Sequence, residues 1–159
     1  MSTRRESREK VLQALYAFEQ AGGSADHIMA TLLKAPLSGD PQSIRFAEKL
    51  FLRTLELAEK ADGIIGQHTQ NWELSRIALI DRLILRMGIC EMMTFADIPP
   101  KVSINEAIEV AKKFSTARSG QFVNGILDAS LVDLKGQGLL KKSGRGLVGM
   151  TLDQEESGA

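Results

Sequence analysis

The stretch that decides the fold is RIALIDRLILRMGICEMMTF, residues 76–95 of a chain of 159 residues. On a helical wheel its charged residues Asp81, Arg82 and Arg86 lie within one arc, and nearly every other position is apolar. A helix with this pattern is buried on most of its sides, so the stretch predicts a central helix around which the other elements pack. Its charges, which include Glu91, also make it too polar for an ordinary membrane span.

Helical periodicity recurs on both sides of this stretch, whereas sustained period-two alternation and hairpin signals are almost absent. The sequence therefore predicts an all-α protein. Its length allows one domain of ordinary size or two small helical subdomains that share a core. Capping residues, glycines and prolines indicate about seven helices, over residues 3–21, 25–35, 42–60, 64–69, 76–95, 103–114 and 121–134.

Several boundaries depend on specific local signals. Pro99 and Pro100 are expected to end the central helix, and Ser103 with Glu106 matches a capping box for the next helix. A break between the third and fourth helices is expected at residues 62–63. Two further segments are expected to form a loop and a flexible glycine-rich tail, namely residues 115–120 and residues 136–159.

The composition limits the function classes. The chain contains 20 basic and 20 acidic residues, so its net charge does not select between acidic and basic partners. A single cysteine excludes an intramolecular disulfide, and two scattered histidines do not provide the spacing of a zinc site. The amino terminus lacks the apolar segment and cleavage site of a secretory signal. These features predict a cytoplasmic protein without a metal, a cofactor or membrane association.

No set of residues completes a catalytic site in the sequence. Cys90 lies within the apolar central stretch, which favours core packing over nucleophilic chemistry. Glu106 is accounted for by the capping box, and Glu109 by ion pairs with lysines one turn later. Glu91 projects away from the charged arc and is expected to pair with an arginine or with backbone amides. Trp72 is expected to anchor the core. The sequence thus predicts a binding protein rather than an enzyme.

Two groups of residues are candidates for RNA binding. The first group is Arg4, Arg5, Arg8 and Lys10. The second group is Lys112, Lys113, Arg118, Gln121, Phe122 and Asn124. If the groups converge, basic side chains contact phosphates, the aromatic ring stacks on a base after a flexible loop, and the amides read polar edges. The ordinary alternative is that both groups are solvated helix surfaces.

Three blocks of the sequence carry a family resemblance: REKVLQALYAFE at residues 8–19, NWELSRIALIDRLILRMGICEM at 71–92, and IPPKVSINEAIEVAKKF at 98–114 followed by GQFVNGILD at 120–128. Their order and spacing resemble the NusB family of transcription antitermination factors, over about residues 4–134.

The resemblance implies two packed helical subdomains, here about residues 3–60 and 61–135. It also implies binding of the boxA element of ribosomal RNA leader transcripts, jointly with the small-subunit ribosomal protein NusE. That complex is expected to join other Nus factors and RNA polymerase, so that transcription of ribosomal RNA resists termination.

The resemblance also assigns residues to surfaces. Positions that match the RNA surface of the family are Arg4, Arg5, Arg8, Arg118 and Phe122. Glu6 occupies a position where basic residues are common, which weakens the basic cluster. Positions that match the NusE-facing side are Tyr16 and Asp81, and the charged arc extends this side to Arg82 and Arg86.

A second hypothesis retains the all-α fold but assigns the chain no RNA-binding role. In this hypothesis the chain is a helical interaction or oligomerisation module, and its apolar helices form a homodimer that hides the arginines. The sequence leaves both hypotheses open.

Overall fold

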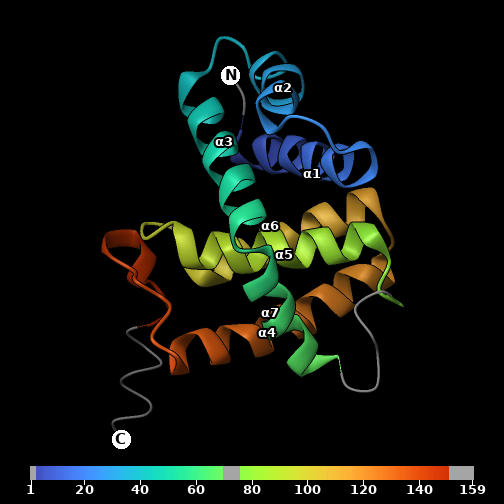
Figure 1. The fold of residues 1–159 in the computed structure, drawn as a ribbon. Helices are drawn as coiled ribbons and strands as arrows, with labels where there is room; N and C mark the ends of the chain where they lie inside the picture. Colours follow the sequence, from blue (N-terminus) through green and yellow to red (C-terminus); the bar gives the residue numbers. More distant parts are fainter. Residues whose placement is uncertain (1–2, 70–75, 151–159) are drawn as a thin grey trace, which may run out of the picture.

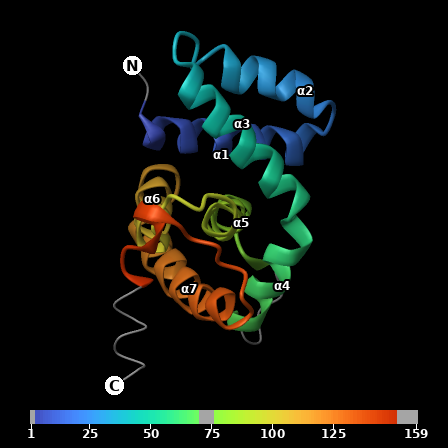
Figure 2. The ribbon, with the colours of Figure 1, turned by 90° about the vertical axis from the view of Figure 1, so that its left-hand side faces the viewer.

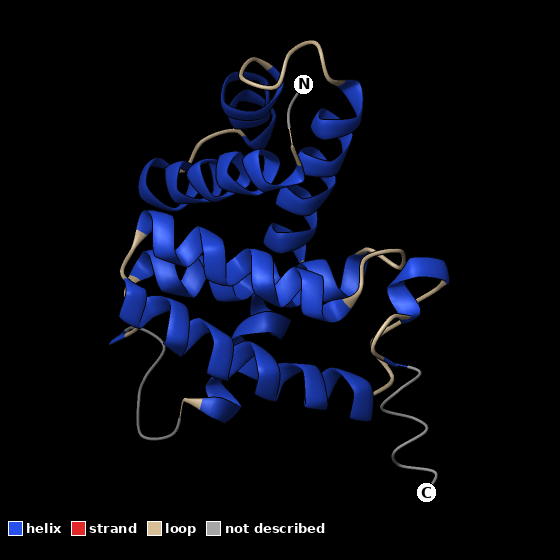
Figure 3. Cartoon of the chain, turned by 180° about the vertical axis from the view of Figure 1, so that it is seen from behind, coloured by secondary structure: helices blue, strands red, loops and turns tan. Residues whose placement is uncertain are grey.

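The computed structural model describes residues 3–69 and 76–150, and every regular element in these two ranges is a helix (Figures 1 and 3). The all-α prediction is therefore confirmed. The elements in chain order are α1 (Arg4–Ala21), α2 (Ala25–Ile28), the π-helical turn η1 (Met29–Lys34), α3 (Pro41–Glu56), α4 (Ala58–His68), α5 (Leu79–Thr94), α6 (Pro100–Phe114), α7 (Ala117–Gly136) and the 3-10 turn η3 (Gly144–Leu147).

Helix α5 lies at the centre of the molecule, as the sequence predicts (Figure 2). Ten of its sixteen residues are buried, and it contacts α1, α3, α4, α6 and α7. Helix α7 approaches it closely at Gly88, where a Cβ atom would lie 2.8 Å from Cδ1 of Leu127. An apolar helix can be buried on so many sides because its few charges find partners on the neighbouring helices.

The other helices form two groups around α5. Helices α1, α2, η1 and α3 lie together on one side, and α4, α6 and α7 surround the remaining sides (Figures 1 and 2). The chain passes from the first group to the second at Leu57, between α3 and α4. The buried apolar side chains of both groups form one continuous cluster, so the two groups share a core.

The amino-terminal boundaries follow local capping rules. The side chain of Thr3 accepts a hydrogen bond from the amide of Glu6, and α1 ends at Gly22, whose φ of +66° is in the left-handed region. Ser24 caps α2 in the same way, and Asp40 caps α3 ahead of a proline in the first turn. The predicted limits of these helices are confirmed to within a few residues.

The expected break at residues 62–63 is wrong, because both residues lie inside α4. Asp62 is compatible with the helix since its carboxylate accepts two hydrogen bonds of 2.7 Å from Arg86 of α5. Gly63 is exposed, and nothing lies within 4 Å of the position of a Cβ atom there. A tertiary ion pair therefore outweighs the local signal for a turn.

The predicted capping box at Ser103 and Glu106 is also wrong. Helix α6 begins at Pro100 with Pro99 as its N-cap, so the prolines start this helix rather than end the central one. A proline in the first helical position has the required φ and lacks only an amide hydrogen that would be unpaired there. Ser103 is consequently buried inside the helix, and Glu106 binds Arg5 of α1.

The expected loop over residues 115–120 is much shorter in the structure. Only Ser115 and Thr116 separate α6 from α7, and the Thr116 side chain accepts a hydrogen bond from the amide of Ser119. Gly120 lies within α7, where a Cβ atom would be 3.3 Å from Cγ of Lys112. Its role is close packing of α7 against α6 rather than a turn.

Residues 137–150 differ from the flexible tail expected beyond Gly136. Nζ of Lys142 donates to the carbonyl oxygen of Phe95 at 2.7 Å, and the backbone amide of Ser143 donates to the carbonyl oxygen of Ala96 at 2.9 Å. A Cβ atom at Gly146 would lie 1.9 Å from the same Ala96 oxygen. These contacts hold the segment against the turn between α5 and α6, where Figure 1 shows it in red.

Other expectations concern the interior. Burial raises the pKa of the Cys90 thiol to about 12, so the thiol is protonated near neutral pH, and the packing prediction is confirmed. Across residues 3–69 and 76–150, no helix combines the length and apolar character that crossing a membrane requires. The same residues contain no group of three or more His, Cys, Asp or Glu side chains able to hold a metal ion. Trp72 lies outside the described residues.

We expect Gly88→Val to destabilise the protein by about 1–3 kcal/mol, because the added side chain meets Leu127 where α5 and α7 are in contact. The matched control is Gly125→Val in α7, where nothing lies within 4 Å of a Cβ atom. Urea denaturation measures both free energies of unfolding. Equal stability of the two variants would show that α5 and α7 do not pack closely at Gly88.

Candidate nucleic-acid interface

The two candidate basic groups lie on neighbouring helices. Nε and Nη2 of Arg5 in α1 donate to the Glu106 carboxylate of α6 at 2.9 and 3.1 Å. Two turns further along α6, Nζ of Lys113 donates to Glu9 of α1 at 2.8 Å. These contacts show that α1 and α6 run side by side in the same direction. We call the line of contact between them, with Arg5, Glu9, Glu106 and Lys113, the α1–α6 seam.

The seam is exposed, and its charges are arranged in pairs. The side chains of Arg5 and Lys113 are 52% and 60% exposed. The hydrogen bonds from Arg5 lower the pKa of Glu106, and the same contact raises the pKa of Arg5. Both groups are therefore charged at neutral pH. Each cation keeps part of its surface in water, where it remains accessible to a phosphate.

Arg8 has a different environment, because it is only 4% exposed. Its Nε and Nη2 atoms donate to the Glu91 carboxylate of α5 at 2.6 and 2.9 Å. The expectation that Glu91 pairs with an arginine is confirmed. The expectation that Arg8 contributes to a free basic surface is wrong, since the buried Glu91 carboxylate of the apolar central helix requires a buried partner.

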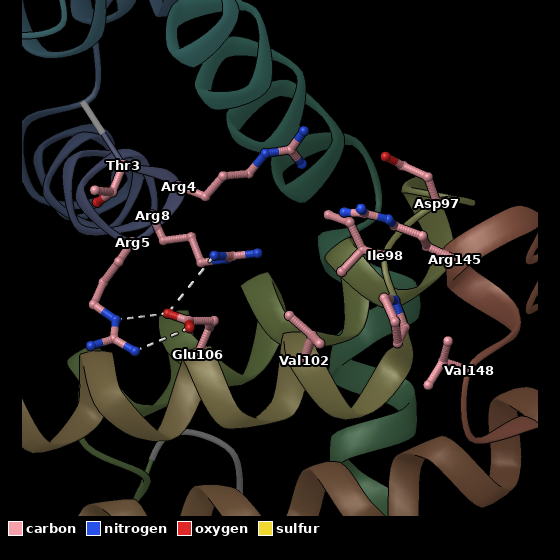
Figure 4. Close-up of a pocket in the computed structure, with 11 residues that line it drawn as sticks. Thr3, Arg4, Arg5, Arg8, Asp97, Ile98, Val102, Glu106, Arg145 and Val148 are labelled. Atoms are coloured by element: carbon pink, nitrogen blue, oxygen red, sulfur yellow. Dashed lines mark hydrogen bonds and ion pairs between the residues drawn. The ribbon is translucent and has the colours of Figure 1, made fainter. Parts of the chain in front are cut away.

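Arg4 lies above the ring of Phe46 in α3, with Cζ 4.5 Å from the ring centroid. It borders a cleft of about 920 Å³, the amino-terminal cleft, which is shown in Figure 4. Arg4 points toward α3 and away from the contact of Arg5 with Glu106, while Arg145 reaches in from the opposite wall. The charged residues that line this cleft are Arg4, Arg5, Arg8, Arg145, Asp97 and Glu106.

The remaining candidates of the RNA surface lie at the end of α6 and the start of α7. Lys112 is exposed and reaches Glu109 at 3.6 Å, as the helical spacing predicts. Phe122 is half-buried against the hydrophobic core, because it lies in the second turn of α7 rather than after a flexible loop. The polar and charged residues of the first two turns of α7 that are exposed are Arg118, Gln121 and Asn124. Lys10 of α1 is half-buried.

The charged arc of α5 connects helices inside the molecule. Asp81 is 9% exposed and accepts a hydrogen bond of 3.0 Å from the hydroxyl of Ser119 in α7. Arg86 binds Asp62 of α4, and this contact raises the pKa of the guanidinium. Arg82 lies 3.9 Å from Glu19 of α1. Asp81 and Arg86, which the resemblance and the charged arc assign to the NusE-facing side, are thus bound to other helices of the same chain.

Tyr16 is the expected partner-binding residue with the largest exposed fraction, at 42%. It lies on α1, beyond the basic first turns of that helix.

Three cations near this surface were missed by the sequence analysis. Arg45 and Lys49 of α3 line a second cleft with Arg4, and Arg145 lines the amino-terminal cleft. The only sequence signal for Arg45 and Lys49 is their spacing of four residues, which is also typical of an ordinary solvated helix face. Nothing in the sequence indicates that Arg145 lies near this surface, because its position depends on the contacts of residues 142–146 with the turn before α6.

We expect Arg8→Met to destabilise the protein by about 3–5 kcal/mol, because it leaves the buried Glu91 carboxylate unpaired. The double variant Arg8→Met with Glu91→Met should recover most of that loss. Arg53→Met serves as the control, since its ion pair with Glu56 is exposed and worth at most about 1 kcal/mol. Chemical denaturation of the unsubstituted protein and the three variants tests this, and a double variant no more stable than Arg8→Met would contradict it.

The chain is similar to known proteins over most of its length. The family model of the NusB family matches residues 5–131. The transcription antitermination protein NusB of Salinibacter ruber is 53% identical over 100% of this chain and 99% of that protein. The protein of the same name from Chloroherpeton thalassium is 42% identical over 96% of this chain and 72% of its own length.

Solved structures show the same fold. A structure of T. maritima NusB has a TM-score of 0.76 and 32% identity, and it covers 83% of this chain and 92% of that one. A structure described as antitermination factors NusB and NusE in complex with dsRNA has a TM-score of 0.74 and 22% identity, over 82% of this chain and 96% of that one, and supports the fold alone. The family match, the full-length relative and the helical arrangement together establish that the chain belongs to the NusB family.

Proposed function

We infer that this chain is a transcription antitermination factor that binds boxA RNA together with the ribosomal protein NusE. The observation that carries the proposal is the α1–α6 seam, where two basic segments about a hundred residues apart in the sequence form one surface. Membership of the NusB family supports it, as does the fold shared with a solved complex of NusB, NusE and dsRNA. In this proposal the protein acts by binding rather than by catalysis.

The chemistry of the surface suits a single-stranded RNA. Exposed basic side chains on the seam provide phosphate contacts that do not depend on sequence. The amides of Gln121 and Asn124, exposed at the start of α7, are placed to donate to and accept from base edges. Phe122 is half-buried against the core, so its ring is less available for stacking on a base than the sequence suggests.

The partner surface is proposed at Tyr16 rather than at Asp81. Tyr16 is exposed on α1, whereas Asp81 is buried and engaged by Ser119. An exposed tyrosine combines a large apolar area with one polar group, which is typical of protein interfaces. We further propose that the complex with NusE joins other Nus factors and RNA polymerase, as the family resemblance implies.

The homodimer without RNA is the alternative. The large apolar side chains that are exposed in the described residues are Tyr16, Leu52, Val102, Val132, Leu147 and Val148. Tyr16, Leu52 and Val132 lie on separate helices, whereas Val102 and Val148 line the amino-terminal cleft, which four arginines also line. A stable dimer requires a contiguous apolar area. The distribution therefore favours the RNA-binding proposal, and light scattering with and without RNA separates the two.

We expect Arg5→Gln with Lys113→Gln to weaken the binding of boxA RNA about tenfold at low salt, because two phosphate contacts are lost. The dependence of log K on log salt should become shallower by about 1.4, at about 0.7 per phosphate on a single strand. A fluorescence titration over a series of salt concentrations measures both quantities.

The matched control is Lys34→Gln with Lys60→Gln, which removes the same charge from exposed positions of η1 and α4. If the seam variant and this control have the same affinity for RNA, the seam is not the RNA surface.

We expect Tyr16→Ser to reduce binding of NusE by about thirtyfold, because truncating a tyrosine at an interface core often costs about 2 kcal/mol of binding free energy. The affinity for RNA alone should remain unchanged, since Tyr16 lies beyond the basic turns of α1. Calorimetry with purified NusE measures the change. Unaltered NusE affinity would show that the partner surface lies elsewhere.

A further inference from the structure

A second cleft, of about 370 Å³, lies between the start of α1 and helix α3. We call it the α3 cleft, and its lining residues are Arg4, Gln42, Arg45, Phe46, Lys49 and Phe95. Three of these six residues are cations and none is acidic. Arg45 and Lys49 are exposed and lie one turn apart on α3.

The cations of the α3 cleft are not neutralised by neighbours. On the α1–α6 seam each of Arg5 and Lys113 has a carboxylate within 3 Å. In contrast, no Asp or Glu among residues 3–69 and 76–150 lies within ion-pair distance of Arg4, Arg45 or Lys49. Three uncompensated cations around one concave site produce a local positive potential that concentrates anionic groups.

Two aromatic rings contact two of these cations, Arg4 and Lys49. Phe46 and Phe95 contact each other with ring centroids 4.8 Å apart and form the apolar base of the cleft. Cζ of Arg4 lies 4.5 Å from the Phe46 centroid, and Nζ of Lys49 lies 5.3 Å from the Phe95 centroid. A cation above a ring face keeps its N–H groups available, so the donors are positioned before an anion arrives.

We propose that the α3 cleft binds backbone phosphates of the same RNA strand that crosses the α1–α6 seam. This inference rests on the proposed function, and it extends the RNA surface onto a helix for which the sequence indicated no role. Arg4 lines both the α3 cleft and the amino-terminal cleft, and Figure 4 shows its side chain directed toward α3. Arg4 therefore joins the α3 cleft to the amino-terminal cleft, which Arg5 of the seam also lines.

The charge and size of the cleft identify the ligand. Its volume suits a phosphate and part of a ribose, and it is too small for a folded element of a protein partner. Lysine and arginine at the walls recognise phosphate oxygens without reading a base. The α3 cleft thus contributes affinity and orientation of the strand, whereas sequence discrimination remains with the amides on α7.

The test is the variant Arg45→Gln with Lys49→Gln, which removes two charges and retains polar side chains of similar length. A labelled single-stranded boxA RNA, long enough to span the seam and α3, is titrated by fluorescence anisotropy at about 50–200 mM salt. We expect about tenfold weaker binding at the lowest salt. We also expect a salt dependence that is shallower by about 1.4, for two phosphate contacts at about 0.7 each.

The matched control is Arg53→Gln with Lys60→Gln. Arg53 lies on the same helix but pairs with Glu56, and Lys60 is exposed on α4, so the control changes the net charge equally without altering either cleft. If the α3 variant loses no more affinity than this control, the inference is overturned. If the double variant is less stable than the unsubstituted protein, the single variant Arg45→Gln tests the inference instead, because it leaves the contact of Lys49 with Phe95 intact. Its RNA affinity is then compared with that of the control.

The seam variant Arg5→Gln with Lys113→Gln separates the two proposals. If it weakens RNA binding while the α3 variant does not, the proposed function stands and only the α3 cleft is excluded. If the unsubstituted protein does not bind the RNA, with or without NusE, both proposals are overturned.

Discussion

Arg8 and Glu91 meet in the interior and join the first helix to the central one. Because both side chains are almost fully buried, neither tolerates the loss of the other, and the contact determines how α1 is rotated on α5. That rotation directs Arg5 toward α6 and Arg4 toward α3. The basic surface on the outside of the molecule thus depends on an ion pair inside it.

The distribution of charge explains how a chain with no net charge can bind a polyanion. Carboxylates on α1 and α6 neutralise part of the seam, which limits nonspecific attraction while leaving exposed cations that can contact phosphates. Among the described residues, no carboxylate lines the α3 cleft or lies within ion-pair distance of Arg45 or Lys49, so none offsets their charges there. Local arrangement, and not the total of basic residues, is the relevant electrostatic quantity.

Sequence reasoning succeeded where the physical cause is local. The apolar periodicity of residues 76–95, the cap at Thr3 and the helix end at Gly22 depend on neighbours a few residues away. It failed where another local signal competed or where a tertiary contact decided. Pro100 starts α6 and so replaces the capping box expected at Ser103. Gly120 lies inside α7 rather than in a loop because α6 packs closely against it.

The sequence by itself determined the class of fold, the central helix and the family, since periodicity and motif spacing are properties of the linear chain. Only the tertiary structure decided which charges are available to a ligand. Arg8 is buried in an ion pair with Glu91, 83 residues away in the sequence. Arg45 and Lys49 line the α3 cleft beside Arg4, and no acidic residue in the described part of the chain lines that cleft. The electrostatic environment of a side chain depends on groups that are distant in sequence and close in space, and helical periodicity carries no information about them.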